Sequence, residues 1–92
     1  MDKITKEKLA KYGNLTSRAL EIAKKSVIGG KKKQAKEIID MVENYLSDSN
    51  YFEKTGDFVS AFAALNYAHG WLDAGARLGI FNVKDDRLFT IK

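Results

Sequence analysis

The chain has 92 residues, of which 45% are apolar and 30% are charged, with a formal net charge of +4. This length and composition predict one folded domain, residues 1–92, rather than a disordered chain. The absence of cysteine excludes disulfide bonds, thiolate catalysis and cysteine-ligated metals, and we expect neither a cofactor nor a metal.

The location of the protein is predicted from what the sequence lacks. No apolar run approaches the roughly 18 residues that a membrane-spanning helix needs. The N-terminal residues, Met1 to Lys6, carry charges without the apolar core of a secretory signal. Small secreted domains usually rely on disulfides. We therefore expect no membrane partner and a cytoplasmic location.

The charge is unevenly distributed along the chain. Residues 1–36 hold eleven basic and three acidic residues, whereas residues 37–92 hold five basic and nine acidic ones. A basic N-terminal third on an acidic body can steer association with acidic partners. The same layout also fits a basic first helix that lies against acidic neighbours within the molecule.

Glycines divide the chain into three segments of helical length, residues 5–28, 31–54 and 57–81. Thr5 is a typical N-cap for the first helix. Its apolar residues recur at intervals of three and four: Leu9, Tyr12, Leu15, Ala19, Ile22 and Ala23. The spacing therefore predicts an amphipathic first helix.

The second helix carries a similar apolar stripe, which consists of Ala35, Ile38, Val42, Tyr45, Ser49 and Phe52. Gly56 suits the left-handed position that ends a helix, and Asp57 is a good N-cap for the next. Links of two or three residues force neighbouring helices to run antiparallel. We predict an all-α fold, an antiparallel three-helix bundle with a short extended tail, residues 82–92.

The third helix is apolar on two sides. One face carries Phe58, Ala61, Phe62, Leu65, Leu72 and Ala76, and the opposite face carries Ala63, Tyr67, Trp71, Ala74, Leu78 and Phe81. Two sibling helices can bury only one of these faces. The candidate interaction face therefore consists of Tyr67, Trp71, Leu78 and Phe81. We expect the tail, a second copy of the chain or another protein to cover it.

The tail itself has two parts. Lys84-Asp85-Asp86 is typical of a turn, and Leu88-Phe89-Thr90-Ile91 is apolar and suits an extended conformation. This segment either folds back on the bundle or binds a partner.

Lysines gather around the turn at Gly29-Gly30, namely Lys24, Lys25, Lys31, Lys32, Lys33 and Lys36. The three that begin the second helix oppose its dipole, so the cluster is a candidate anion-binding site for phosphate or nucleic acid. The glycine and Ser/Thr positions of a P-loop are missing. The alternative is an ordinary solvated turn.

A narrow polar ribbon, made of Asn66, His69, Asp73 and Arg77, separates the two apolar faces of the third helix. His69 is the only histidine in the chain, so a zinc site lacks ligands and no enzymatic activity is expected. His69, Asp73 and Arg77 follow one another at i, i+4 spacing and can interact on one helix. The ribbon is a candidate small-ligand site or, alternatively, a surface ion pair.

Two resemblances concern the second and third helices. The spacing resembles that of one tetratricopeptide hairpin at seven positions, namely Tyr45, Ser49, Phe52, Gly56, Ala61, Leu65 and Ala68. The chain departs from this motif because Asp48 replaces the usual leucine and Asp73 stands where the closing proline would be. No second repeat follows. We interpret this as shared hairpin packing.

The stretch from Ala64 to Gly79, ALNYAHGWLDAGARLG, resembles the signature of family 357 among the domains of unknown function, a set of short archaeal helical proteins. The resemblance implies a helical bundle in an intracellular archaeal protein. It carries over no catalytic residue, because the family has no established activity. Together, these features predict a non-enzymatic interaction or assembly module that associates with itself, as a dimer, or with another protein.

Overall fold

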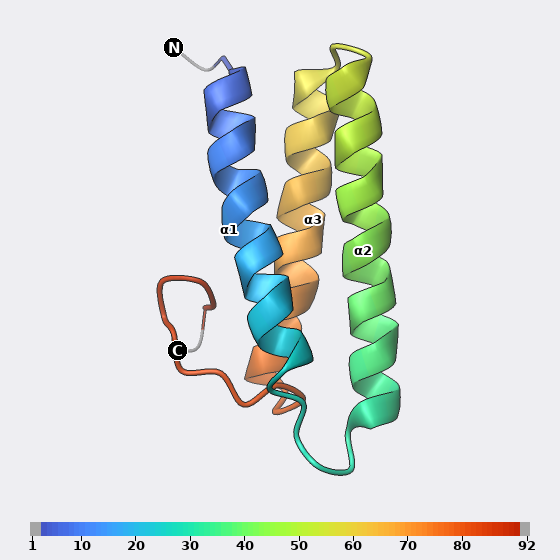
Figure 1. Ribbon diagram of the computed structural model, residues 1–92, viewed down its shortest axis with the longest axis vertical. Helices are drawn as coiled ribbons and strands as arrows, with labels where there is room; N and C mark the ends of the chain where they lie inside the picture. Colours follow the sequence, from blue (N-terminus) through green and yellow to red (C-terminus); the bar gives the residue numbers. More distant parts are fainter. Residues whose placement is uncertain (1–2, 91–92) are drawn as a thin grey trace.

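The computed structural model describes residues 3–90 and contains three α-helices, α1 (Lys6–Lys24), α2 (Lys32–Lys54) and α3 (Phe58–Arg77). The chain runs down α1, up α2 and down α3, so consecutive helices are antiparallel (Figure 1). Within the described residues no strand longer than an isolated bridge forms, and no helix is long and apolar enough to cross a membrane. The predicted all-α three-helix bundle is confirmed.

Side chains of the expected types begin the first and third helices. The Thr5 hydroxyl oxygen accepts a hydrogen bond from the backbone N–H of Lys8 (3.1 Å), and the Asp57 carboxylate accepts one from Ser60 (3.1 Å). Each satisfies a backbone donor that the first turn of a helix leaves free. Lys31, the N-cap residue of α2, makes no such side-chain hydrogen bond.

Helices α2 and α3 end in the same way. Gly56 and Gly79 have φ angles of 82° and 74°, which a residue with a Cβ adopts only under strain. After α3, the N–H of Ile80 donates to the carbonyl of Gly75 (2.9 Å), which closes a Schellman motif. Helix α3 therefore stops at Arg77, four residues before the predicted end.

The first helix also ends early, at Lys24 instead of residue 28, because the chain turns to pair with the segment after α3. Val27 forms an isolated antiparallel bridge with Phe81. The N–H of Ile28 donates to the Ile80 carbonyl (3.0 Å), and that of Asn82 donates to the Ser26 carbonyl (2.8 Å). These bonds tie the α1–α2 link to the start of the tail.

The main core lies between the helices and includes the tail. Its fully buried residues come from α1, α2, α3 and residues 80–89, among them Ala23, Val42, Leu72, Phe81 and Phe89. A smaller cluster of Leu9, Ala61 and Leu65 fills the opposite end of the bundle.

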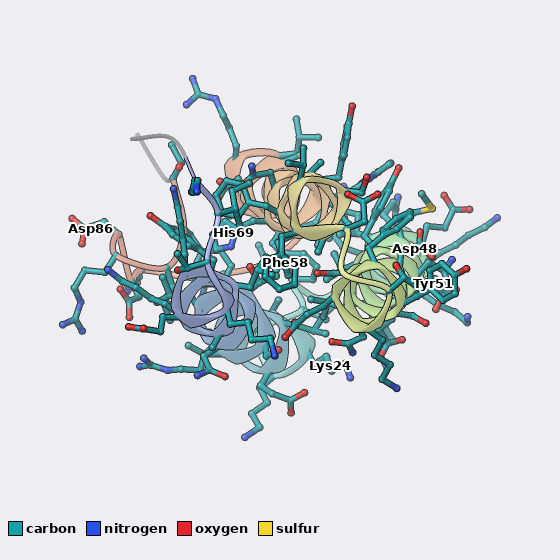
Figure 2. All side chains as sticks on the ribbon, turned by 90° about the horizontal axis from the view of Figure 1, so that it is seen from above. Lys24, Asp48, Tyr51, Phe58, His69 and Asp86 are labelled. Atoms are coloured by element: carbon teal, nitrogen blue, oxygen red, sulfur yellow. The ribbon has the colours of Figure 1, made fainter. Side chains whose placement is uncertain are left out.

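Helices α2 and α3 pack most closely, and the buried Ser49 hydroxyl donates to the Ala61 carbonyl (2.9 Å) across their interface. A view along the bundle shows the tail, marked by Asp86, on the outer side of α1 and α3, far from α2 (Figure 2). The tail therefore helps to hold α1 in place.

Candidate functional site

The candidate interaction face on α3 is open to solvent over most of its length. Tyr67 is 63% exposed, Trp71 38% and Leu78 73%. Together with Ala74 they form a stripe with steps of four, three and four residues, which we call the outer face. The ring of Tyr67 stacks on that of Tyr45 from α2, with centroids 5.4 Å apart, so α2 borders the outer face at one point.

A shallow depression of about 350 Å³ lies within the outer face, lined by Asn66, Tyr67, Gly70, Trp71 and Ala74. Gly70 has nothing near the position of a missing Cβ. The small residues at the centre of the depression, Gly70 and Ala74, leave room for another backbone to approach.

The prediction that Phe81 belongs to this face is wrong. Because α3 ends at Arg77, Phe81 lies beyond the helix and turns inward, where it is 2% exposed. Its ring lies against Gly75, in the space where a Cβ would stand. The sequence signal for this was Arg77-Leu78-Gly79, a basic last turn followed by a glycine.

The tail does not cover the outer face; the described part, up to Thr90, folds back over α1 and α3 instead. Leu88 and Phe89 are buried in the main core. The prediction that this segment is extended is wrong: the Phe89 N–H donates to the Asp85 carbonyl (3.0 Å), and the chain forms one turn there. Ile91, the last residue of the predicted apolar segment, lies outside the described residues, as does Lys92.

Two residues of the polar ribbon hold this tail. Nε2 of His69 lies 2.6 Å from the carbonyl oxygen of Leu88, and since a carbonyl only accepts, Nε2 carries the proton. The Asp73 carboxylate accepts from the Thr90 N–H (2.8 Å). The side chains of His69 and Asp73 are partly buried, 26% and 28% exposed, where they contact the tail.

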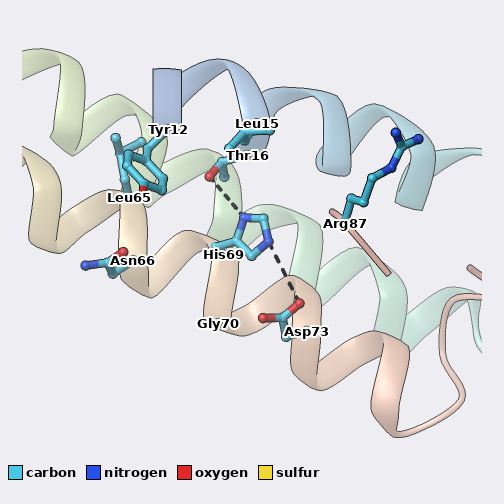
Figure 3. Close-up of a pocket in the computed structure, with 9 residues that line it drawn as sticks. All are labelled: Tyr12, Leu15, Thr16, Leu65, Asn66, His69, Gly70, Asp73 and Arg87. Atoms are coloured by element: carbon cyan, nitrogen blue, oxygen red, sulfur yellow. Dashed lines mark hydrogen bonds and ion pairs between the residues drawn. The ribbon is translucent and has the colours of Figure 1, made fainter. Parts of the chain in front are cut away.

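Thr16 of α1 completes the arrangement. Its hydroxyl lies 3.1 Å from Nδ1 of His69, which accepts this hydrogen bond when the ring is neutral (Figure 3). The sequence analysis did not single out Thr16. It lies seven residues from both Leu9 and Ala23, at a core position of α1, and a hydroxyl at such a position needs a partner.

A cavity of about 330 Å³ lies beside His69, lined by Tyr12, Leu15, Thr16, Leu65, Asn66, His69, Gly70, Asp73 and Arg87. It brings together three of the four polar-ribbon residues. Nε2 of His69 and the Asp73 carboxylate are 3.9 Å apart, and both are already engaged by the tail. The fourth, Arg77, is exposed and forms no ion pair within residues 3–90.

Two members of the lysine cluster make ion pairs, and the other four make none within residues 3–90. Lys24 binds Glu43 of α2 (3.0 Å), and Lys36 binds Asp40 (2.8 Å). These hydrogen bonds raise the pKa of both ammonium groups above the ordinary value. Lys25, Lys31, Lys32 and Lys33 are exposed around the uncapped start of α2, so the basic character of the turn is retained.

The fold and these sites define a small helical bundle with an open apolar helix face, an intramolecularly bound tail and a basic turn. The chain belongs to the family described as "protein of unknown function (DUF357)", whose model matches residues 11–81. No curated protein and no solved structure matches the chain. The family match covers α1 from residue 11 onward, all of α2 and α3, and ends at Phe81, before the tail segment.

Proposed function

We propose that the chain is a non-enzymatic helical interaction module that binds a partner helix along the outer face of α3. The observation that carries this proposal is the exposure of Tyr67, Trp71 and Leu78 on one side of the helix while the tail is docked elsewhere. Exposed aromatic residues of this kind dominate the binding energy of protein interfaces.

The spacing of the outer face favours a helix as the partner. Residues 67, 71, 74 and 78 follow the four-three-four rhythm of a coiled-coil seam. Gly70 and Ala74 lie at its centre, where small residues let two helices come close. Arg77 is the only ionised side chain on the exposed side of α3, so a docking helix desolvates almost no charge there.

The simplest partner is α3 of a second copy, and sedimentation at several concentrations tests it. We expect a concentration-dependent dimer that Tyr67→Ala and Trp71→Ala each weaken at least tenfold. Tyr51→Ala is the matched control, because Tyr51 is equally exposed (64%) but lies on α2. A wild-type chain that stays monomeric, with Trp71 open to a quencher, would remove self-association from the proposal.

A second candidate function is anion binding at the α1–α2 turn. It is supported by the absence of both a side-chain cap and an acidic residue in the first turn of α2, next to four exposed lysines. Backbone N–H groups and lysines together suit phosphate or nucleic acid. Replacing Lys31, Lys32 and Lys33 by Gln should abolish binding in a low-salt titration, whereas the same change at the exposed Lys3, Lys6 and Lys54 should have little effect.

The setting that we propose for this module is the cytoplasm of an archaeal cell. The family resemblance supports it, and so does the absence of cysteine from the chain. For the cavity beside His69 we propose no catalytic role, because His69 and Asp73 in its lining are bound to the tail.

A further inference from the structure

The tail occupies the groove between α1 and α3 in the way a bound peptide does. The polar contacts from α3 go to its main chain: His69 donates to the carbonyl of Leu88, and Asp73 accepts from the N–H of Thr90. These two groups flank Phe89. The groove therefore recognises a backbone conformation rather than the polar side chains of the tail.

Two adjacent apolar side chains anchor the segment. Leu88 is 3% exposed and Phe89 2%, whereas Asp86 and Arg87 point into solvent. The Asp85 side chain accepts from the Arg87 N–H (2.9 Å) and so caps the single turn that presents both anchors. This hydrogen bond holds the pKa of Asp85 below its ordinary value. The bound element has the form Asp-x-x-Leu-Phe.

The docked turn is a small, locally stabilised unit on a short tether. The bridge between Val27 and Phe81 fixes the start of the tail, so only residues 82–84 separate that anchor from the turn. A tether this short gives the tail an effective concentration in the millimolar range. In the intact chain a free peptide therefore competes poorly with the tail, and the tail occupies the groove.

We propose that the groove between α1 and α3 is a binding site for a peptide of the form Asp-x-x-Leu-Phe, and that residues 85–89 are its resident ligand. His69 and Asp73 hold the main chain of the guest, and the core between the helices receives its two apolar side chains. This site is separate from the outer face of α3, and it stands or falls independently of helix binding there.

The test empties the groove in the 92-residue chain and supplies the segment as a separate peptide. The variant is Phe89→Ala, and the probe is a synthetic peptide of residues 83–90. We expect the peptide to raise the Tm of the variant in a concentration-dependent way. It should also shift the ring signals of His69 in NMR spectra. A peptide with serine at both anchor positions should do neither.

The matched control is Phe81→Ala. Phe81 is as deeply buried as Phe89, in the same core, but it is not part of the peptide. The peptide should leave the Tm of this variant unchanged. If Phe89→Ala does not fold alone, recovery of helical circular dichroism on adding the peptide is the equivalent readout, and Leu88→Ala provides a milder variant.

The role of His69 is tested in the same experiment. Adding His69→Ala to Phe89→Ala should weaken peptide binding about tenfold, because a hydrogen bond to the guest is lost. The proposal is overturned if millimolar peptide changes neither the Tm nor the NMR spectrum of the Phe89→Ala and Leu88→Ala variants. It is also overturned if Phe81→Ala responds to the peptide equally.

Discussion

The α2–α3 hairpin and the α1–tail half of the bundle are held together by different means. The hairpin has a long, direct helix interface, a buried Ser49–Ala61 hydrogen bond and a glycine at the end of each helix. Helix α1 touches α2 much less than it touches α3. The tail packs against α1 and α3, and its Leu88 and Phe89 join the core.

The difference shows that the shortest link joins the most tightly packed pair of helices in this fold. A short link at Gly56 holds α2 and α3 side by side, so their pairing needs little loop-closure entropy. The α1–tail half joins groups far apart in the chain, such as Thr16 of α1 with His69 of α3 and Leu88 of the tail with His69. We therefore expect the hairpin to set the global stability and the α1–tail half to open first.

The largest expected effect compares two buried leucines. Leu72 of α3 is fully buried in the main core, and Leu9 of α1 is 2% exposed at the more open end. Leucine-to-alanine changes in cores cost about 2–5 kcal/mol. Leu72→Ala should fall near the upper end of that range and Leu9→Ala near the lower end, because a polar cavity between α1 and α2 adjoins Leu9 and lets the site relax.

Urea unfolding of both variants measures this pair. Equal losses for Leu72→Ala and Leu9→Ala would contradict the unequal division of stability between the two halves. An unchanged m-value in both variants would show that each change acts on stability rather than on the compactness of the unfolded state.

His69→Ala separates the tail from the hairpin. It removes the contacts to the Leu88 carbonyl and to Thr16, which are partly buried, and it should cost about 1–3 kcal/mol. In hydrogen-exchange measurements, the amide of Thr90 should lose protection while the amides of α2 keep theirs. Arg77→Ala, on the exposed side of α3, should change stability by no more than about 0.5 kcal/mol.

A pair of glycine substitutions tests the end of α3. Gly79 has a φ of +74°, and alanine there should cost about 1 kcal/mol, because a Cβ disfavours the left-handed region. Gly29 does not have a positive φ and has open space around it, so Gly29→Ala should be close to neutral. Thermal unfolding should show a Tm lower by about 4–8 °C for the first variant only.

The helices could be predicted from the sequence because their signals are local. Thr5 and Asp57 cap helices as expected, and the three- and four-residue spacing of apolar side chains marks all three. The end of α3 was missed because the apolar pattern continues through Ile80 and Phe81. Periodicity does not distinguish a further helical turn from a buried loop.

The candidate site was only partly predictable, for a different physical reason. The sequence singled out the polar ribbon as a candidate site, but the partners of His69 lie 53 and 19 residues away in the chain. No local pattern encodes such pairings. The tail was expected to be extended, whereas Asp85 caps a turn whose stability depends on burying Leu88 and Phe89 against helices that the sequence alone does not position.

The smallest expected effect concerns Lys24, which makes an ion pair between α1 and α2. Its hydrogen bond to Glu43 raises the pKa of Lys24, so the pair stabilises the fold fully below the unfolded pKa of about 10.4 and loses this contribution as pH rises through the higher folded value. Both side chains are well exposed, so Lys24→Gln should cost no more than about 0.5 kcal/mol, and salt should reduce that further. The difference in Tm between wild type and Lys24→Gln should be constant from pH 6 to 9 and should shrink as the pH rises through the raised folded pKa of Lys24. A difference that grows with pH would show that Lys24 acts through packing rather than charge.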